Sequence, residues 1–402
     1  MTASTCLKRF AVAGTLVLLS ALPVAAGEKA IRIGVLTDLS GQFADLGGPG
    51  SVIAAKMAAE EFQNSVNGKP VEILSADLLN KPDVAAAIAR RWFDTEGVDA
   101  IVDVPLTSVA FAIQNLGRDR KKVVFINAAA ADALTKKECS PYTIHWQDDS
   151  YALSVGTARA VLAAGGKTWF FLTPDYSFGH LMEAAATKTI VDNGGVVKGT
   201  AKFPLGTADY SSQLVTASAS KADIYAASTV GGDTLNLIKQ ANEFQLVKGK
   251  QRIVVFQVFL PEVHSLGLDR AHSMYVTDGF YWDKNDQSRA WSKEFFKRHG
   301  KMPSKVQAYV YLSVKHYLTA IKEGGSDATE AVTRKMKSMP AYNFGDSAYI
   351  RPNGRVMYDL ALYEVKSPSE SKYPWDYYRR LSTIPAHEAF GGQDTDACNL
   401  SH

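Results

Sequence analysis

Residues that could bind a small molecule follow four short apolar runs in this sequence of 402 residues. The four segments bring together hydroxyl, aromatic and small side chains and read Pro105-Leu106-Thr107-Ser108, Asn127-Ala128-Ala129-Ala130, Pro174-Asp175-Tyr176-Ser177-Phe178-Gly179 and Ser228-Thr229-Val230-Gly231-Gly232-Asp233. A hydroxyl at a helix start can hold an anionic group, and small side chains let backbone N–H groups approach a ligand. Each segment alone also fits ordinary turn and cap chemistry, but their shared position after apolar runs favours a binding site.

Sequence patterns of catalysis, of nucleotide binding and of metal binding are weak. Gly165-Gly166-Lys167-Thr168 ends like a phosphate loop, but Val161 stands where its first glycine belongs and the segment precedes a predicted strand. Gly47-Gly48-Pro49-Gly50 lacks dinucleotide-binding spacing. The eight histidines show no zinc-ligand spacing and there is no Gly-x-Ser-x-Gly elbow. We therefore expect no enzyme activity, no metal and no cofactor, while a secreted hydrolase with paired carboxylates stays an alternative.

Residues 1–26 have the three parts of a secretory signal peptide. Lys8 and Arg9 form a basic region, Phe10 to Leu22 is an apolar run, and Pro23 to Ala26 ends on small residues. A membrane anchor would need about 20 apolar residues without that small-residue exit. We therefore expect the mature protein to be exported to the periplasm.

The cysteines bear on the same export prediction. Cys6 lies in the predicted leader, so Cys139 and Cys398 are the cysteines of the mature chain. Both lie in polar, turn-like sequence rather than in apolar runs, and an even count in an exported protein favours a disulfide between them. Two buried free thiols are the alternative.

The elements that must position the four segments alternate between short β-branched runs and amphipathic stretches. The predicted strands are Ile31–Leu36, Val71–Leu74, Ala100–Val104, Val123–Ile126, Thr168–Leu172, Val196–Ala201, Ile224–Ala227 and Ile253–Phe256. The third, fourth, fifth and seventh of these strands precede the four segments. Alternation of strand and helix predicts parallel sheets, and such sheets bind ligands outside the carboxyl ends of their strands. The fold class is therefore α/β, with the pattern restarting near residue 168. Tyr142–Trp146 and Val276–Trp282 are extended and aromatic-rich, and we expect them to cross between two domains.

The composition agrees with two globular domains. Hydrophobic residues make up 46% of the chain and charged residues 21%, which suits cores of ordinary size and excludes a disordered chain. The formal net charge is only +3, so nothing in the composition points to a nucleic-acid partner.

Three of these stretches carry a family resemblance. Ile33-Gly34-Val35-Leu36-Thr37-Asp38-Leu39-Ser40-Gly41, the stretch from Phe125 to Thr135, and Asp175-Tyr176-Ser177-Phe178-Gly179 resemble the branched-chain-amino-acid type of periplasmic substrate-binding protein of ABC transporters. The resemblance runs in order through nearly all of residues 31–365. It implies two doubly wound Rossmann-like lobes joined by three crossovers, the type I periplasmic-binding-protein fold. The lobes would comprise 27–147 plus 283–348 and 148–282 plus 349–402, and a membrane permease would be the partner.

The resemblance also places the ligand contacts. The family's carboxylate-holding hydroxyl falls on Thr107, its backbone contacts fall on Ala128 and Ala130 beside Asn127, and its second-lobe aromatic falls on Phe178 with Tyr176 beside it. Its next ligand loop falls on Ser228 and Thr229, and the crossover-side aromatic falls near Tyr309.

Two departures from the family pattern change the expected ligand. Gln257 stands where the amino-acid receptors of the family place an acid that holds the ligand ammonium, and Leu46 stands where they place an aromatic. A buried ammonium without a partner is costly, so we expect a small carboxylic acid with an aromatic or apolar body. The alternatives are an amino-acid receptor of the same family and a sensory receptor. We expect a monomer.

Overall fold

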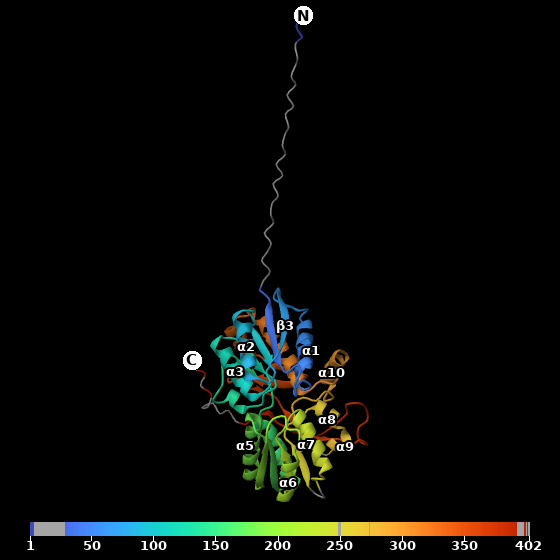
Figure 1. The fold of residues 1–402 in the computed structure, drawn as a ribbon. Coiled ribbons are helices and arrows are strands. Elements are labelled where there is room, and N and C mark those ends of the chain that lie inside the picture. The colour runs from blue at the N-terminus through green and yellow to red at the C-terminus, as the bar shows by residue number, and fades with distance from the viewer. Residues whose placement is uncertain (4–28, 248–250, 273, 392–397, 399, 401–402) are drawn as a thin grey trace.

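The computed structural model describes residues 1–3, 29–247, 251–272, 274–391, 398 and 400. These residues form two α/β lobes, which lie one above the other in Figure 1. We call the upper body lobe 1 and the lower body lobe 2. Most of the predicted signal peptide at 1–26 lies outside the described residues.

Lobe 1 is built on a six-stranded sheet in the order β2-β3-β1-β4-β5-β6. Every neighbouring pair is parallel except the β2–β3 hairpin. Its strands are β1 (Ile31–Thr37), β2 (Ser65–Val66), β3 (Lys69–Asp77), β4 (Ala100–Asp103), β5 (Val123–Ile126) and β6 (Thr143–His145). Its helices are α1 (Gly48–Glu60), α2 (Pro82–Asp94), α3 (Thr107–Asp119), α10 (Asp286–His299), α11 (Lys305–Gly324) and α12 (Thr329–Ser338).

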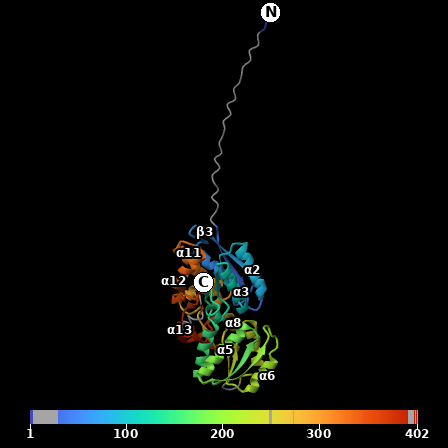
Figure 2. The ribbon, with the colours of Figure 1, turned by 90° about the vertical axis from the view of Figure 1, so that its left-hand side faces the viewer.

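Helices cover both faces of this sheet, as the alternation of strand side chains requires. Val102 and Phe125 pack in a core with α1 and α11, whereas Ile101 and Val124 pack with α2 and α3. Helix α11 comes from a much later part of the chain and lies against α1. Figure 2 shows α11 and α12 on one side of lobe 1 and α2 with α3 on the other.

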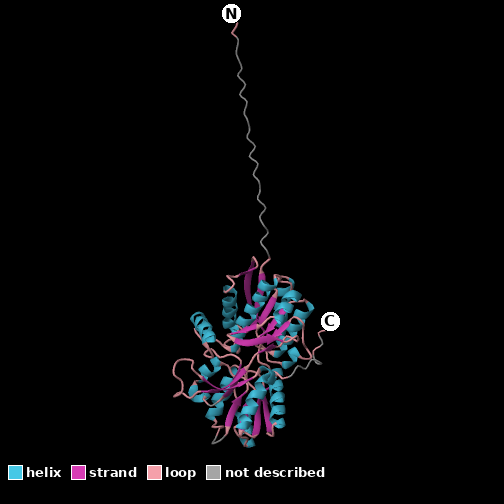
Figure 3. Cartoon of the chain, turned by 180° about the vertical axis from the view of Figure 1, so that it is seen from behind, coloured by secondary structure: helices cyan, strands magenta, loops and turns pink. Residues whose placement is uncertain are grey.

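Lobe 2 is built on a four-stranded parallel sheet in the order β10-β9-β7-β8. Its strands are β7 (Thr168–Pro174), β8 (Val196–Phe203), β9 (Ile224–Ala227) and β10 (Arg252–Val255). Its helices are α4 (Ser150–Ala163), α5 (Ser177–Asp192), α6 (Ser211–Ser220), α7 (Gly232–Glu243), α8 (Leu260–Leu266) and α9 (Leu268–Ala271). Figure 3 shows the two groups of strands from behind, each flanked by helices.

Two small antiparallel sheets complete the fold. One joins β11 (Tyr275–Asp278), β15 (Leu360–Val365) and β16 (Tyr378–Ile384), and the other joins β12 (Ala341–Asn343), β13 (Asp346–Ile350) and β14 (Val356–Met357). A 3-10 turn, η1 (Asp132–Thr135), and a short helix, α13 (Ala386–Ala389), lie outside the sheets. The chain passes between the lobes three times, after β6, after β11 and between β14 and β15, so the predicted fold with three crossovers is confirmed.

The predicted parallel strands are all present, but the segment Tyr142–Trp146 differs from its prediction. We expected a crossover there, and the structure instead forms β6, the sixth strand of the lobe 1 sheet, paired with β5. The crossing itself follows directly afterwards, before α4 begins at Ser150. A short edge strand and an extended linker have the same apolar, aromatic-rich sequence, which is why the pattern could not separate them.

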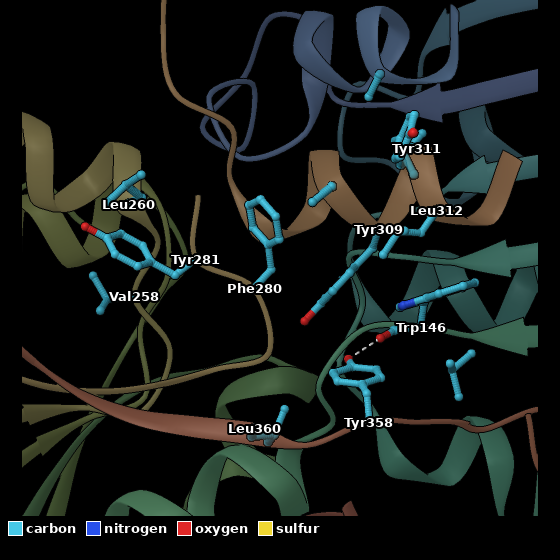
Figure 4. Close-up of a cluster of buried hydrophobic side chains, with 14 of the residues drawn as sticks. Trp146, Val258, Leu260, Phe280, Tyr281, Tyr309, Tyr311, Leu312, Tyr358 and Leu360 are labelled. Carbon is cyan, nitrogen blue, oxygen red and sulfur yellow. Dashed lines mark hydrogen bonds between the residues drawn. The ribbon is translucent and has the colours of Figure 1, made fainter. Parts of the chain in front are cut away.

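Aromatic side chains pack where the crossovers meet (Figure 4). The rings of Tyr309, from α11, and Tyr358, from the third crossover, lie 5.6 Å apart. The dashed line in Figure 4 joins the Tyr358 hydroxyl to the carbonyl of Trp146, in the first crossover. Phe280 and Tyr281, after β11 in the second crossover, are also buried, and Figure 4 shows Tyr281 on the side of Val258 and Leu260.

A buried ion pair ties the same crossovers together. The Lys305 ammonium, at the start of α11, lies 2.8 Å from Asp148 Oδ2 and 3.8 Å from Asp278 Oδ1. Asp148 Oδ1 also accepts hydrogen bonds from the hydroxyls of Tyr309, at 3.0 Å, and Tyr358, at 2.6 Å. Burial lowers the pKa of Lys305, but the two carboxylates outweigh that effect and hold it above its ordinary value. Lys305 therefore joins the first and second crossovers, and Asp148 connects the third through Tyr358.

The predicted disulfide between Cys139 and Cys398 is confirmed, with their Cα atoms 5.7 Å apart. Cys139 follows η1 in lobe 1, whereas the chain leading to Cys398 comes from β16 and α13. Phe390, in that stretch, packs against the Arg355 guanidinium and against Tyr358. The tail is thus attached beside the crossovers.

Candidate ligand-binding site

The topology places one pocket between the two sheets. In lobe 1 the strand order changes direction between β1 and β4, and in lobe 2 it does so between β7 and β9. Such switch points leave a crevice at the carboxyl ends of the strands. A pocket lies there, with walls from both lobes.

The lobe 1 wall is formed by residues at the ends of β1, β4 and β5 and at the starts of α1, α3 and α11. They are Thr37, Phe43, Leu46, Gly47, Asp103, Pro105, Leu106, Thr107, Ala128, Ala129, Ala130 and Val306. The lobe 2 wall is formed by residues that follow β7, β9 and β10, which are Tyr176, Phe178, Val230, Gln257 and Phe259. Seven of the predicted site residues therefore meet here: Leu46, Thr107, Ala128, Ala130, Tyr176, Phe178 and Gln257.

Thr107 is the first residue of α3 and lines the pocket. The N-cap is Leu106, which makes no side-chain cap bond, and Thr107 is only 2% exposed. Its Oγ1 has no hydrogen-bond partner among the described residues. Because buried hydroxyls nearly always have a partner, this one is free for a ligand. The positive end of the α3 dipole lies at the same place and favours an anionic group.

Asp103, the last residue of β4, was not among the predicted site residues. Its side chain is fully buried, and the hydroxyls of Ser51 and Thr37 lie beside it, but neither carboxylate oxygen makes a hydrogen bond of ordinary geometry with a described residue. Burial raises its pKa to about 6, the nearby Ser51 and Thr37 hydroxyls lower it, and the charge of Asp38 raises it further. The pocket wall therefore carries the carboxylate of Asp103. The position at which the amino-acid receptors of the family place an acid is occupied by Gln257.

Gly47 makes room for this carboxylate. A Cβ atom at Gly47 would lie 2.6 Å from Asp103 Oδ2. Any side chain at this position would therefore displace Asp103, so the glycine at the α1 entry serves the pocket wall rather than a nucleotide phosphate.

Aromatic rings give the pocket its apolar surface. Tyr176 and Phe178 lie after β7 with ring centroids 6.0 Å apart, and Phe259 follows β10. Burial raises the pKa of the Tyr176 hydroxyl, with smaller contributions from Asp233 and Glu262, so this hydroxyl stays neutral. Flat rings with few polar atoms suit an aromatic or branched aliphatic ligand body.

Four predicted site residues lie outside the pocket wall and have other contacts. The Asn127 amide donates to the Tyr309 carbonyl at 3.1 Å and to Ser313 Oγ at 2.7 Å, while its Oδ1 accepts from the Asp103 N–H. The Tyr309 hydroxyl contacts Asp148 in the crossovers. Thr229 Oγ1 accepts from the Thr234 hydroxyl, whereas Ser228 is buried and its hydroxyl has no hydrogen-bond partner among the described residues.

Other wall residues were not among the predicted ligand contacts, although Pro105, Leu106, Ala129 and Val230 lie in the four candidate segments. These other wall residues are Thr37, Phe43, Gly47, Asp103, Pro105, Leu106, Ala129, Val230, Phe259 and Val306. A usable signal existed for Asp103, because it is the one charged residue of the apolar run Ala100–Val104. Phe259 had a weaker signal, since it follows a predicted strand by only a few residues.

The two lobes touch at the edge of the pocket. Gly231, the N-cap of α7 in lobe 2, has a φ of +66°, and a Cβ there would lie 2.9 Å from the Gln42 carbonyl and 3.3 Å from the Phe43 ring of lobe 1. A groove between α3 and α5 shares Thr107 with the pocket. The lobes therefore approach each other on both sides of the pocket.

Within the described ranges, no group of three or more His, Cys, Asp or Glu side chains is arranged to hold a metal ion. Among the helices that the structure describes, none combines the length and the apolar composition needed to cross a membrane.

A pocket enclosed by two doubly wound lobes, with three crossovers behind it, defines a two-lobed ligand-binding protein. The chain belongs to the periplasmic binding protein family, whose model matches residues 30–372. It is similar to a periplasmic binding protein from Burkholderia mallei, with 41% identity, a TM-score of 0.90, and coverage of 94% of this chain and 100% of that chain. No curated protein matches the chain.

Two further solved structures extend the comparison. A branched chain amino acid ABC transporter periplasmic ligand-binding protein from Burkholderia xenovorans has 38% identity and a TM-score of 0.81, with coverage of 92% of this chain and 100% of that chain. A solute binding protein of an ABC transporter from R. palustris, in complex with benzoate, has 18% identity and a TM-score of 0.82, with coverage of 92% and 100%. The present chain is thus a periplasmic substrate-binding protein of the ABC-transporter type, a class that works with membrane permeases.

Proposed function

We propose that this protein captures a small carboxylic acid with an aromatic or apolar body and delivers it to an ABC importer. The observation that carries the proposal is the unpartnered Thr107 hydroxyl at the start of α3, set in a pocket otherwise lined largely by apolar side chains. Ligand carboxylate oxygens would accept from this hydroxyl and from backbone N–H groups near Ala130, while Tyr176 and Phe178 would enclose the apolar body.

The similar proteins support this ligand class without deciding the ligand. The solute binding protein from R. palustris is in complex with benzoate, and its likeness to this chain is one of fold. The relative from Burkholderia xenovorans carries the words branched chain amino acid in its description. An amino acid is therefore the second candidate, and Gln257 at the family's ammonium position is the residue that disfavours it.

The proposal includes export and lobe closure. We propose that residues 1–26 are removed, so that the mature chain begins at Gly27 in the periplasm and acts there as a monomer. The two lobes, with the boundaries predicted from the sequence, would close on the ligand through the three crossovers. N-terminal sequencing of exported protein tests the cleavage, and an intact Met1 on that protein would contradict it.

Two measurements test the ligand class. Native mass spectrometry of protein purified without added ligand should show a bound small acid. Thermal shifts with aromatic acids, aliphatic acids and amino acids should then rise for the acids, because a ligand that binds only the native state adds about 2.7 kcal/mol at a hundredfold excess over Kd. A response to amino acids alone would transfer the proposal to the second candidate, and consumption of the ligand would favour a hydrolase.

A further inference from the structure

We propose that Asp103 selects ligands that carry a hydrogen-bond donor, either a hydroxyl or an ammonium group, in addition to their carboxylate. The inference rests on the proposed function, because it assumes that the ligand occupies the pocket between the lobes. It adds a specificity-determining residue at a position where the sequence comparison with the family placed no ligand contact.

The first argument is the state of the Asp103 carboxylate. It lines the pocket, it is fully buried, and although the Ser51 and Thr37 hydroxyls lie beside it, neither of its oxygens makes a hydrogen bond of ordinary geometry with a described residue. Buried carboxylates are ordinarily paired or multiply hydrogen-bonded, because burial of an unpaired charge is costly. A ligand group that donates a hydrogen bond would supply what the protein does not.

The second argument is the charge of the wall. Asp103 is the only charged side chain among the described residues that line the pocket, and no lysine, arginine or histidine lies among them. A ligand with a carboxylate and no donor would therefore bring a second negative charge to a site without a positive side chain. The buried Lys305 does not relieve this charge, because its ion pairs are with Asp148 and Asp278.

The third argument is that hydrogen bonds fix the main chain of Asp103, whereas its carboxylate oxygens make none of ordinary geometry with the described residues. Its N–H donates to Asn127 Oδ1 at 2.9 Å, and its carbonyl accepts from the N–H groups of Asn127 at 2.9 Å and Ala128 at 3.2 Å. The backbone here is unusual, since Asp103, Val104 and Leu106 have φ values of +79°, +60° and +68°. Non-glycine residues rarely adopt such values, and where they do, the surroundings hold them there. The carboxylate is thus held in place at the pocket wall.

The test uses matched ligand pairs that differ only in the donor. The pairs are benzoate with 4-hydroxybenzoate and 4-methylpentanoate with leucine, and each is titrated calorimetrically into the wild type, Asp103→Ala and Asp103→Asn. The control is Asp233→Asn, because Asp233 is equally buried but has partners in the Gly206 N–H and the Tyr210 hydroxyl and does not line the pocket.

We expect the wild type to bind the donor-bearing member of one pair at least tenfold more tightly than the other member, and Asp103→Ala to lose that preference. Asp103→Asn separates the two donors. Its amide oxygen still accepts from a hydroxyl, so the preference for 4-hydroxybenzoate would persist, whereas the preference for an ammonium would be lost with the charge. Asp233→Asn should retain the wild-type preference.

Equal affinities within both pairs, or a preference that survives in Asp103→Ala, would overturn the role of Asp103 while leaving the proposed function intact. If neither pair binds and a ligand of another class copurifies, the proposed function itself is overturned and this inference with it. Circular dichroism and melting of both Asp103 variants show that they are folded, and Asp103→Asn remains informative if the alanine variant is not, because asparagine tolerates the positive φ at this position.

Discussion

Thr107 presents a buried hydroxyl that the protein itself does not use. We expect Thr107→Ala to weaken ligand binding by about fivefold to more than a hundredfold, which corresponds to the loss of roughly 1 to 3 kcal/mol for a ligand acceptor left without its donor. The melting temperature of the ligand-free variant should stay close to that of the wild type, because no cap bond is lost. Ser108→Ala, one residue further on and exposed, is the matched control. An unchanged Kd in Thr107→Ala would remove this residue from the site.

The buried Asp103 carboxylate should make the stability of the ligand-free protein depend on pH. Its pKa is raised to about 6 by burial, above the value near 4 of an unfolded chain. The native state therefore binds this proton more tightly, and the contribution of Asp103 to the free energy of unfolding falls as the pH rises from about 4 to about 6. The total loss is about 3 kcal/mol.

Asp103→Asn lacks this titration, so its stability relative to the wild type should rise by up to about 3 kcal/mol between pH 4 and pH 7. Urea unfolding of both proteins at intervals across this range measures the difference. A difference in the free energy of unfolding between the two proteins that stays constant across these pH values would show that Asp103 does not titrate in this way. A gain in stability at the expected cost in selectivity would be an example of the usual conflict between stability and function.

At the scale of residues, the sequence predicted the part of the site that follows from strand ends. Thr107, Tyr176 and Phe178 come directly after apolar runs, and the structure brings them into one pocket. Asp103 was missed because an acid inside an apolar run is interpreted as part of a strand, and nothing local shows that its side chain stays unpaired. Tyr309 was placed by resemblance at the ligand, whereas its hydroxyl lies against Asp148 in the crossovers.

Gly231, the N-cap of helix α7, limits how closely the two lobes can approach. Gly231→Ala should weaken ligand binding, because the added Cβ would lie 2.9 Å from the Gln42 carbonyl of lobe 1 and hold the lobes apart. The positive φ of +66° also makes alanine unfavourable in lobe 2 itself. Calorimetry gives the change in Kd, and small-angle scattering of the ligand-bound variant should show a more extended molecule than the wild type.

Gly267→Ala separates the two effects. Gly267 has a φ of +76° at another helix junction of lobe 2, and no atom of the described part of the chain lies within 4 Å of the position a Cβ would take. It should therefore lower the melting temperature as Gly231→Ala does but leave the Kd unchanged. Equal effects of both variants on affinity would mean that backbone strain, and not lobe contact, explains the result.

At the scale of elements, the sequence predicted the strands that are continuous apolar runs and missed those of mixed composition. β4, β5, β9 and β10 are apolar runs flanked by turns, and each was expected within a residue or two of its bounds. The sheet of β12, β13 and β14 was not anticipated, because strands of two to five residues have no periodicity that a sequence pattern can show. Their position depends on packing against α11 and α12, which only the folded chain brings together.

The buried Lys305 ammonium pairs with Asp148 of the first crossover and Asp278 of the second. Lys305→Met should lower the free energy of unfolding by about 3 to 5 kcal/mol, because Asp148 would remain buried without its charge partner. The double variant Lys305→Met with Asp148→Asn should recover part of this loss, because Asp278 is then the one carboxylate of this group left without its cation. Lys301→Met, which removes only an exposed ion pair with Asp45, is the control and should change stability by no more than about 1 kcal/mol. Chemical unfolding of the four proteins checks the set.

The disulfide acts on the molecule as a whole, because it joins residues 259 positions apart. Cys398→Ser should lower the melting temperature, and the free energy lost should be a few kcal/mol if the constraint on the unfolded chain is the main contribution. Reductant should shift the wild type toward the variant and leave Cys398→Ser unaffected. A wild type that melts at the same temperature with and without reductant would show that the bond does not stabilise the fold.

The position of Cys398 also determines the order of maturation. It follows every strand and helix that the structure describes, so the bond can close only after the segments that form both lobes are present. The cross-link therefore closes late and fixes the fold rather than directing it. In the proposed mature chain without Cys6, the thiols of Cys139 and Cys398 allow a single intramolecular pairing, so its oxidation needs an oxidant and no isomerase.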